Sequence, residues 1–284
     1  MNTLPTLIRR EFWEHRVLWM VPVAVAACYL LFAIVAGSMM NPAQMNAARM
    51  SGEGPPALFV GVQMVLIGFL FVLVSIVLFF YLADSLYAER RDRSILFWKS
   101  LPVSDSATVL SKLLVALIVT PIGVLLLSMV VNALAFLIFY VRLHDSPATS
   151  GYVRWDTATW FRLYGTLFLN VLVLALWYAP IAAYQLMVSA WVRSAVFVWT
   201  ILPPLVLALG EKLMFDSWNI GRFLLYRLST GIGGGSTDLA SVDQFLGRIS
   251  LLERLRQPDL WGGVAVAAVF VYAAIRIRRY RDDT

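Results

Sequence analysis

The sequence predicts an all-α membrane protein, a polytopic bundle of six transmembrane helices. Hydrophobic residues make up 60% of the 284 residues and charged residues only 14%, whereas soluble domains average roughly 45–50% apolar and about 25% charged. The apolar residues are gathered in long runs that contain no Asp, Glu, Lys, Arg or His. Basic residues flank these runs at both ends of the chain. These observations exclude a soluble enzyme, a secreted module and a disordered regulator.

Six apolar runs are interpreted as membrane spans. A span needs about 20 residues, with roughly 17–25 usual, so the first four are long enough and the last two, at 16 residues each, are short. The two short runs can still cross, because the flanking Arg193 and Lys212 can extend their charged ends towards water. The six predicted spans cover residues 17–37, 57–83, 113–141, 163–191, 195–210 and 260–275.

Basic residues predict the orientation of the spans. Three arginines precede the first span and four follow the last, which is typical of cytoplasmic ends. Two cytoplasmic termini require an even number of spans, so the short runs either both cross or both fail to cross. Six spans are favoured, and four remain the alternative. The arginines are Arg9, Arg10 and Arg16 before the first span and Arg276, Arg278, Arg279 and Arg281 after the last.

Three segments lie outside the predicted spans. Residues 3–16 have apolar side chains at helical spacing and charged ones in other directions, which predicts an amphipathic helix in the cytoplasmic interface. The alternative is a polar tail that only sets topology. Residues 84–112 form the large cytoplasmic connection. Residues 211–259 form a long extracytoplasmic segment, in which Trp218 and Phe223 indicate an interfacial or re-entrant helix.

The cytoplasmic connection carries an unusual apolar cluster. Pro102 interrupts a helix, and Ser104 can cap the next helix, which runs through Lys112 into the third span. So much apolar surface in a cytoplasmic loop must lie on the membrane, pack beneath the bundle or dock to a partner. The apolar residues are Ile95, Leu96, Phe97, Trp98, Leu101 and Val103.

Several functions are excluded by what the sequence lacks. No span contains the ionisable residue on which a proton- or ion-driven transporter depends. There is no His-Glu-x-x-His pattern and no P-loop, so the chain has neither a zinc-protease motif nor its own ATP site of that type. The single cysteine, Cys28, and two distant histidines offer no metal site. No basic stripe on a soluble domain indicates nucleic acid.

The polar residues within the spans are neutral. One interpretation is that they form hydrogen bonds between helices, worth about 0.6 kcal/mol on average. The functional interpretation is that four of them line a pathway for an amphipathic substrate, namely Asn132, Asn170, Tyr178 and Gln185.

The segment Glu89–Ser104, with Val109–Lys112 after it, resembles the cytoplasmic loop of bacterial ABC-2 (type-2) ABC transporter permeases. Both have an acidic-basic run, a Leu-Pro-Val-Ser element and a lysine entering the third span. The layout agrees over the whole chain, although residues 211–259 are longer than the usual outer hairpin of the family. The resemblance implies an N-terminal elbow helix (residues 3–16) and a coupling helix in the 84–112 loop.

The same resemblance implies the function and the partners. The chain would be the permease subunit of an ATP-driven exporter in the bacterial inner membrane, paired with a second permease, identical or paralogous. It would bind no cofactor itself, since ATP and Mg would be held by separate ATPase subunits. The residues expected to dock to the ATPase are Arg90, Arg91, Arg93, Phe97, Trp98, Leu101, Pro102 and Val103.

Two alternatives from other classes stay open. A lipid-modifying membrane enzyme would need an ionisable cluster at one interface, for which Asp84, Glu89 and Arg90 are the only candidates. A membrane assembly protein that transports nothing is the other. An ATPase gene beside this one would favour the exporter over both.

Overall fold

The computed structural model describes residues 3–39, 55–92, 103–143, 157–229 and 251–280, and these are helical with no strand among them. Six of the helices are long and apolar enough to span a membrane. The helical elements in chain order are α1 (Thr3–Glu14), α2 (Val17–Met39), α4 (Pro55–Arg91), α6 (Asp105–Leu114), the π-helical turn η1 (Val115–Val119), α7 (Thr120–Leu143), α8 (Thr157–Trp191), α9 (Val196–Phe215), α10 (Asn219–Ser229), α12 (Leu251–Arg256) and α13 (Pro258–Tyr280).

The prediction of a six-helix all-α membrane bundle is confirmed. The two runs that are short in sequence belong to α9 and α13, helices of 20 and 23 residues. They are longer than their apolar runs because charged residues continue each helix beyond the run: Glu211 and Lys212 in α9, and the arginines from Arg276 onward in α13.

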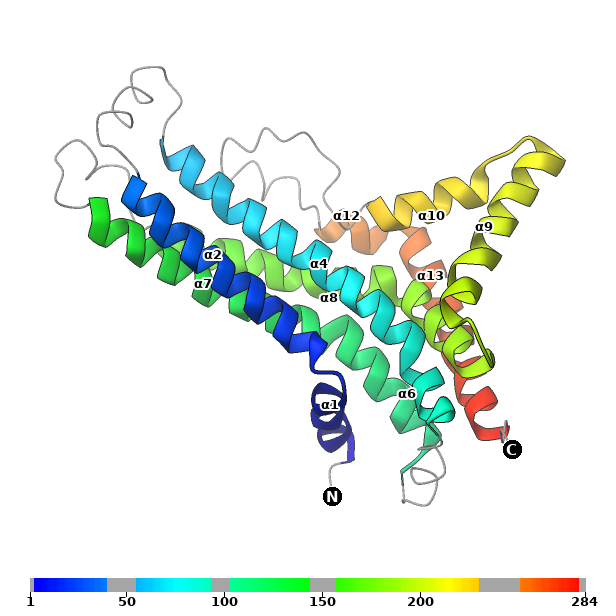
Figure 1. The fold of residues 1–284 in the computed structure, drawn as a ribbon. Helices are drawn as coiled ribbons and strands as arrows, with labels where there is room; N and C mark the ends of the chain where they lie inside the picture. Colours follow the sequence, from blue (N-terminus) through cyan, green and yellow to red (C-terminus); the bar gives the residue numbers. More distant parts are fainter. Residues whose placement is uncertain (1–2, 40–54, 93–102, 144–156, 230–250, 281–284) are drawn as a thin grey trace.

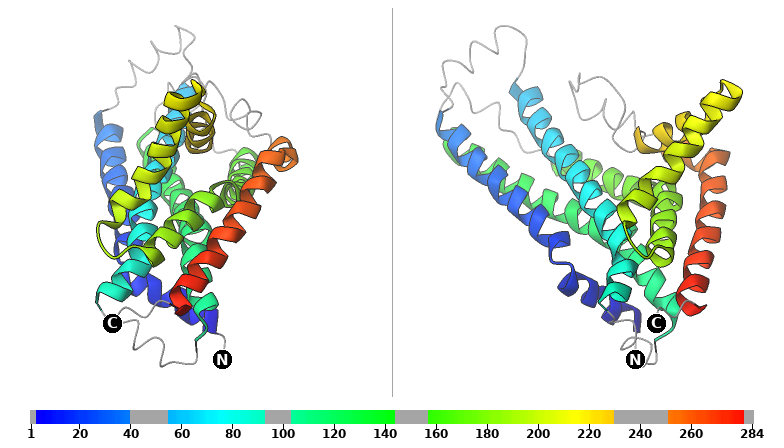
Figure 2. Two further views of the ribbon diagram at one scale, coloured as in Figure 1. Left: turned by 90° about the vertical axis from the view of Figure 1, so that its right-hand side faces the viewer. Right: turned by 45° about the vertical axis from the view of Figure 1, so that its right-hand side comes forward.

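The spanning helices pack in a continuous series. Helix α2 lies along α7 and α4, α4 lies along α8, and α8 packs most extensively against α13. Helix α9 contacts α4, α8 and α10 and leaves much of its apolar surface exposed, as expected for a helix that faces lipid. The α2–α7 pair and the α9 and α13 helices diverge towards one end of the bundle and converge at the other (Figures 1 and 2).

We call the end where the helices converge the basal end, and the opposite end, with α10 and α12, the distal end. The basal end carries α1, the start of α6 and the last turns of α13, with both chain termini nearby (Figure 1). Its apolar core includes Leu18, Leu86, Val109, Leu186 and Ala274, which come from five different helices. Apolar packing therefore already joins these elements.

The third span is interrupted by η1. Pro121 has no N–H group and its ring would collide with the carbonyl four residues earlier in a regular helix. The chain widens just before it, so that the Thr120 N–H bonds to the Val115 carbonyl, five residues back. Helix α6 thus meets α7 through a π turn.

Candidate functional site at the basal end

Four buried charged side chains meet at the basal end, and we call them the basal ion cluster: Glu11 of α1, Glu89 of α4, Lys112 of α6 and Arg278 of α13. Lys112 Nζ lies 2.9 Å from Glu11 Oε1 and 3.1 Å from Glu89 Oε1. Arg278 Nη1 lies 2.5 Å from Glu89 Oε2. Two carboxylates and two cations are therefore buried together, with each charge next to an opposite one.

Groups at the edge of the cluster extend it towards the surface. Arg10 Nη2 donates to Glu89 Oε1 at 3.1 Å and to Glu14 Oε2 at 3.0 Å. Arg278 Nε donates to Asp105 Oδ1, at the first residue of α6. Burial lowers the pKa of Arg10, but the carboxylates of Glu14, Glu89 and Glu11 raise it above its ordinary value, so its charge is retained.

Local sequence explains how these side chains reach one another. Glu11 lies on the same face of α1 as Leu7 and Ile8, which pack against α6 and its neighbours. Glu89 follows Leu86 and Leu82 at spacings of three and seven, on the buried face of α4. Apolar packing therefore carries the charges inward, and their burial is tolerated because they are paired.

Lys112 is oriented by the start of its helix. The Ser104 side chain accepts a hydrogen bond from the Ala107 N–H at 3.2 Å and so caps α6, which confirms the predicted cap. Helix α6 then runs for ten residues, with Thr108, Val109, Ser111 and Lys112 buried. Lys112 therefore belongs to the helix that begins directly after the 93–104 connection.

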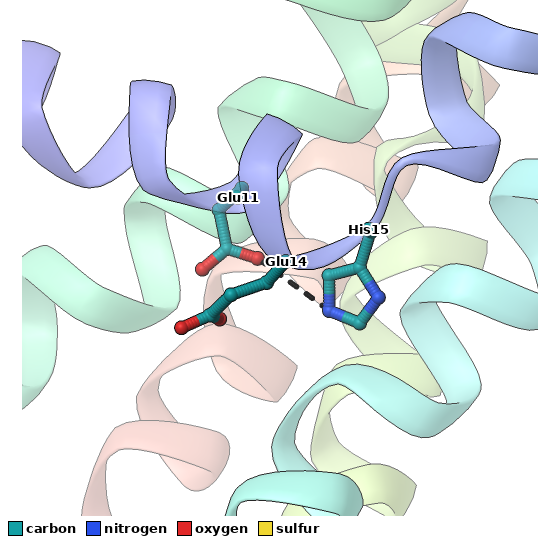
Figure 3. Close-up of side chains that lie close together, drawn as sticks. All are labelled: Glu11, Glu14 and His15. Atoms are coloured by element: carbon teal, nitrogen blue, oxygen red, sulfur yellow. Dashed lines mark ion pairs between the residues drawn. The ribbon is translucent and has the colours of Figure 1, made fainter.

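Figure 3 shows Glu11, Glu14 and His15 close together at the end of α1, with ligand atoms within 4.8 Å of one another. Such a set could hold a metal ion. Here Glu11 receives hydrogen bonds from Lys112 and from the Tyr81 hydroxyl, while both Glu14 oxygens bond to Arg10. We therefore assign these carboxylates to neutralising Lys112 and Arg10 rather than to a metal.

The residues predicted to dock to an ATPase are only partly described. Arg93, Phe97, Trp98, Leu101 and Pro102 lie outside the described residues. The half-buried Val103 immediately precedes α6, and Arg91 is exposed, 3.0 Å from Asp92.

Arg90 is engaged within the chain. Its Nη2 donates to the carbonyls of Ser189 and Val192 at 2.7 and 2.6 Å, at the end of α8. The Ser189 hydroxyl in turn accepts from the Leu86 and Tyr87 N–H groups. Arg90 therefore joins the end of α4 to the α8–α9 turn, and the predicted pairing of Arg91 and Arg93 with acids of a partner stays a prediction.

The four residues predicted to line a substrate pathway are spread over the bundle. Asn132 is buried on α7 and donates to the Tyr164 hydroxyl. Asn170 and Gln185 both lie on α8, fifteen positions apart, which is roughly 22 Å along a helix. Tyr178 lies between them on α8 and donates to the Leu228 carbonyl of α10 at 3.3 Å. The pathway assignment stays a prediction for these residues.

A buried arginine at the distal end was not singled out from the sequence. Arg227 of α10 donates to the carbonyls of Trp177 and Asp259, and the Trp177 indole N–H donates back to the Arg227 carbonyl at 3.1 Å. Its guanidinium lies 4.9 and 5.0 Å from the ring centres of Trp177 and Phe223. We call this the distal arginine site. It ties α10 to α8 and to the start of α13.

Comparison with known families finds a match for the segment that contains the 93–104 connection. Residues 55–153 match the family model described as ABC-2 family transporter protein. The match supports the predicted resemblance to ABC-2-type permeases. It covers 99 of the 284 residues, from the start of α4 through the 93–104 connection, α6 and α7 to residue 153, ten residues beyond the end of α7. The motifs that carried the resemblance lie inside it, so the predicted resemblance is confirmed.

The match is consistent with a transport component, and the six long apolar helices support a protein that crosses the membrane several times. A comparison with curated proteins found no significant match. Two residues of the basal ion cluster, Glu89 and Lys112, lie inside the matched segment. Glu11 and Arg278 lie outside it.

Proposed function

We propose that this ABC-2-type permease is the membrane-spanning subunit of an ATP-driven ABC exporter, in which it forms the substrate pathway and couples to separate ATPase subunits. The observation that carries the proposal is the family match over α4, the 93–104 connection, α6 and α7. ATP and Mg would bind to the partner ATPase, and a second permease, identical or paralogous, would complete the pathway.

The proposed orientation places the basal end in the cytoplasm of a bacterial cell, at the inner membrane. Arginines are dense at this end, in α1 and in the last turns of α13, as the positive-inside rule requires. The connection between α4 and α6 would then face the ATPase with its apolar residues and with the exposed Arg91. Apolar anchors supply affinity at such contacts, while charges mainly supply orientation.

Orientation can be tested with single cysteines in a Cys28→Ala background, which removes the only native thiol. Tyr280→Cys reports the basal end and Leu213→Cys the distal end, since both side chains are well exposed. In intact cells, an impermeant thiol reagent should label the distal cysteine and spare the basal one. Labelling of Tyr280→Cys from outside would contradict the proposed orientation.

ATPase docking is tested by purifying the full chain from its native membrane and measuring hydrolysis of ATP–Mg by the subunits that copurify. Leu101→Asp places a charge among the proposed anchors and should abolish copurification of the ATPase, or should uncouple hydrolysis from transport. Leu213→Asp is the matched control, because it introduces the same change at an exposed distal leucine. A folded wild-type chain that copurifies with no ATPase would contradict the exporter and favour an assembly protein.

The competing proposal of a lipid-modifying enzyme requires accessible ionisable groups at one interface. Glu89 and Arg90 of its three candidate residues are occupied by contacts within the chain. Asp84 is half-buried, and the two residues predicted to act with it are engaged elsewhere. These contacts support the transport subunit over the enzyme.

A further inference from the structure

The basal ion cluster is placed at both ends of the 93–104 connection. Glu89 lies three residues before Asp92, the last residue described on the α4 side. Asp105, the first residue of α6, lies on the other side and bonds to Arg278. A movement of the connection would therefore act directly on side chains of the cluster.

Glu89 is the centre of the cluster. Its two carboxylate oxygens contact Arg10 of α1, Lys112 of α6 and Arg278 of α13 at 3.1, 3.1 and 2.5 Å. One side chain of α4 therefore contacts three other helices. The contacts are directional, because each pairs a specific oxygen with a specific nitrogen, whereas the apolar contacts around them can slide.

Stability alone does not account for such a centre. Buried ion pairs pay a large desolvation penalty, and replacing them with well-packed apolar residues is often neutral or stabilising. The surrounding apolar core already joins the same helices. A set of buried pairs in this position is therefore better explained by the need to hold four helix ends in one fixed arrangement.

Two of the four elements joined by Glu89 meet a break in helical continuity, whereas α4 and α13 are unbroken. Helix α1 is separated from α2 by the turn at His15 and Arg16. Helix α6 is separated from α7 by the π turn η1, three residues after Lys112. Both breaks are positions at which the joined elements can rotate relative to the spans that follow them.

We propose that Glu89 is a positioning residue that makes α1, α6 and the basal ends of α4 and α13 into one rigid cap, through which movement of the 93–104 connection reaches the spans. This inference rests on the proposed function, because it assumes that an ATPase moves the connection. Movement of the cap acts directly on α4 and α13, which continue unbroken from it into the bundle, while the α1–α2 turn and η1 allow α1 and α6 to move with it.

The rigidity of the cap can be measured with spin labels. In a Cys28→Ala background, Trp13→Cys on α1 and Tyr280→Cys on α13 place labels on exposed side chains. The distance between them is measured by pulsed electron spin resonance on the full chain with its copurified ATPase, without nucleotide and after trapping with ATP–vanadate. The cap requires one narrow distance distribution that is the same in both states.

The decisive variant is Glu89→Gln with Arg278→Met. It removes one charge of each sign, leaving the Lys112–Glu11 and Arg10–Glu14 pairs intact. The distribution should broaden, and its maximum should shift on nucleotide trapping. The matched control is Asp92→Asn with Arg279→Met, which makes the same changes at exposed neighbours and should behave as wild type.

Two results would overturn the proposal: a distance that shifts with nucleotide in the wild type, or an unchanged narrow distribution in the double variant. If the double variant is not monodisperse, Arg278→Lys takes its place, because one ammonium cannot span both Glu89 and Asp105 as the guanidinium does. If the wild-type chain copurifies with no ATPase, that result contradicts the proposed function instead. In that case the spin-label distance distribution measured without nucleotide tests the cap separately. A broad distribution contradicts the cap.

Discussion

The two ends of the bundle bury cations in opposite ways. At the basal end, Lys112 and Arg278 are neutralised by carboxylates from other helices. At the distal end, Arg227 is surrounded by backbone carbonyls and aromatic rings. The first arrangement depends on the balance of full charges, and the second depends on the fit of one guanidinium to fixed dipoles and ring faces.

The difference has consequences for how each end tolerates change. Removing a single charge from the basal ion cluster leaves an opposite charge buried without its partner, which is costly whichever sign is removed. Removing the distal charge leaves no buried carboxylate behind, so shape and hydrogen bonding should matter more there. Burial accordingly lowers the pKa of Arg227, against the opposing effect of Asp259.

The largest expected effect is that of Lys112→Met. Glu11 and Glu89 would then lose the cation they share, and the free energy of unfolding should fall by about 3–5 kcal/mol. Lys212→Met is the matched control, since Lys212 pairs with Asp216 at the surface and such pairs contribute about 0–1 kcal/mol. Unfolding in detergent, followed by tryptophan fluorescence, measures both.

A second substitution sharpens the result for Lys112. Adding Glu11→Gln to Lys112→Met removes one of the two stranded carboxylates and should recover part of the loss. If Lys112→Met is no more destabilising than Lys212→Met, charge balance does not hold the basal end together.

Arg227→Lys tests whether the distal end depends on the guanidinium fork. A lysine keeps the charge but cannot bond to the Trp177 and Asp259 carbonyls while lying flat against Trp177. We expect a loss of about 1.5–3 kcal/mol, the range for hydrogen bonds to charged groups. Arg222→Lys, at an exposed position on the same helix, should be neutral in the same unfolding experiment. Equal stabilities for the two variants would show that charge alone suffices at the distal end.

Gly263→Ala tests the same site from α13. A Cβ at Gly263 would collide with Arg227 Nη2, whereas a Cβ at the adjacent Gly262 would meet nothing within 4 Å. Displacing the buried guanidinium should cost about 1–3 kcal/mol, offset by about 1 kcal/mol of helix propensity. Gly262→Ala gains helix propensity without displacing the guanidinium, so it should be the more stable variant. The reverse order of midpoint temperatures would exclude close packing of Arg227 on α13.

The bundle could be predicted because its signals are local. Apolar run length indicates the spans, the spacing of Leu7 and Ile8 indicates α1, and Ser104 before Asp105 indicates the cap of α6. The ends of α9 and α13 were underestimated, since charged residues extend a helix beyond its apolar run.

The basal ion cluster could not be predicted in the same way. Its pairs join residues of different helices that are 23, 101 and 189 positions apart, and no local pattern says which helix ends meet. A signal was present in part: Glu11 lies on the apolar face of α1, and a buried acid requires a partner. That signal predicts that a cation exists without identifying Lys112.

The smallest expected effect concerns His15, at the edge of the cluster. Burial and the Lys112 ammonium lower its pKa below 6.5, although the acidic groups near it act in the opposite direction. The ionisable groups around it are Glu11 and Glu14 of α1, Lys112 of α6, and Asp84 and Tyr81 of α4.

A lowered pKa means that the unfolded chain binds a proton more readily than the folded one. Stability should therefore be constant above about pH 6.5, the ordinary value for histidine, and should fall as the pH falls below it. His15→Gln removes the titrating group, so its stability should fall less steeply from pH 7 to pH 5 than that of the wild type, with Lys112 and Glu11 unchanged. Parallel pH profiles for the two proteins in thermal unfolding would exclude His15 as the source of the slope and would leave the carboxylates of the basal ion cluster to explain it.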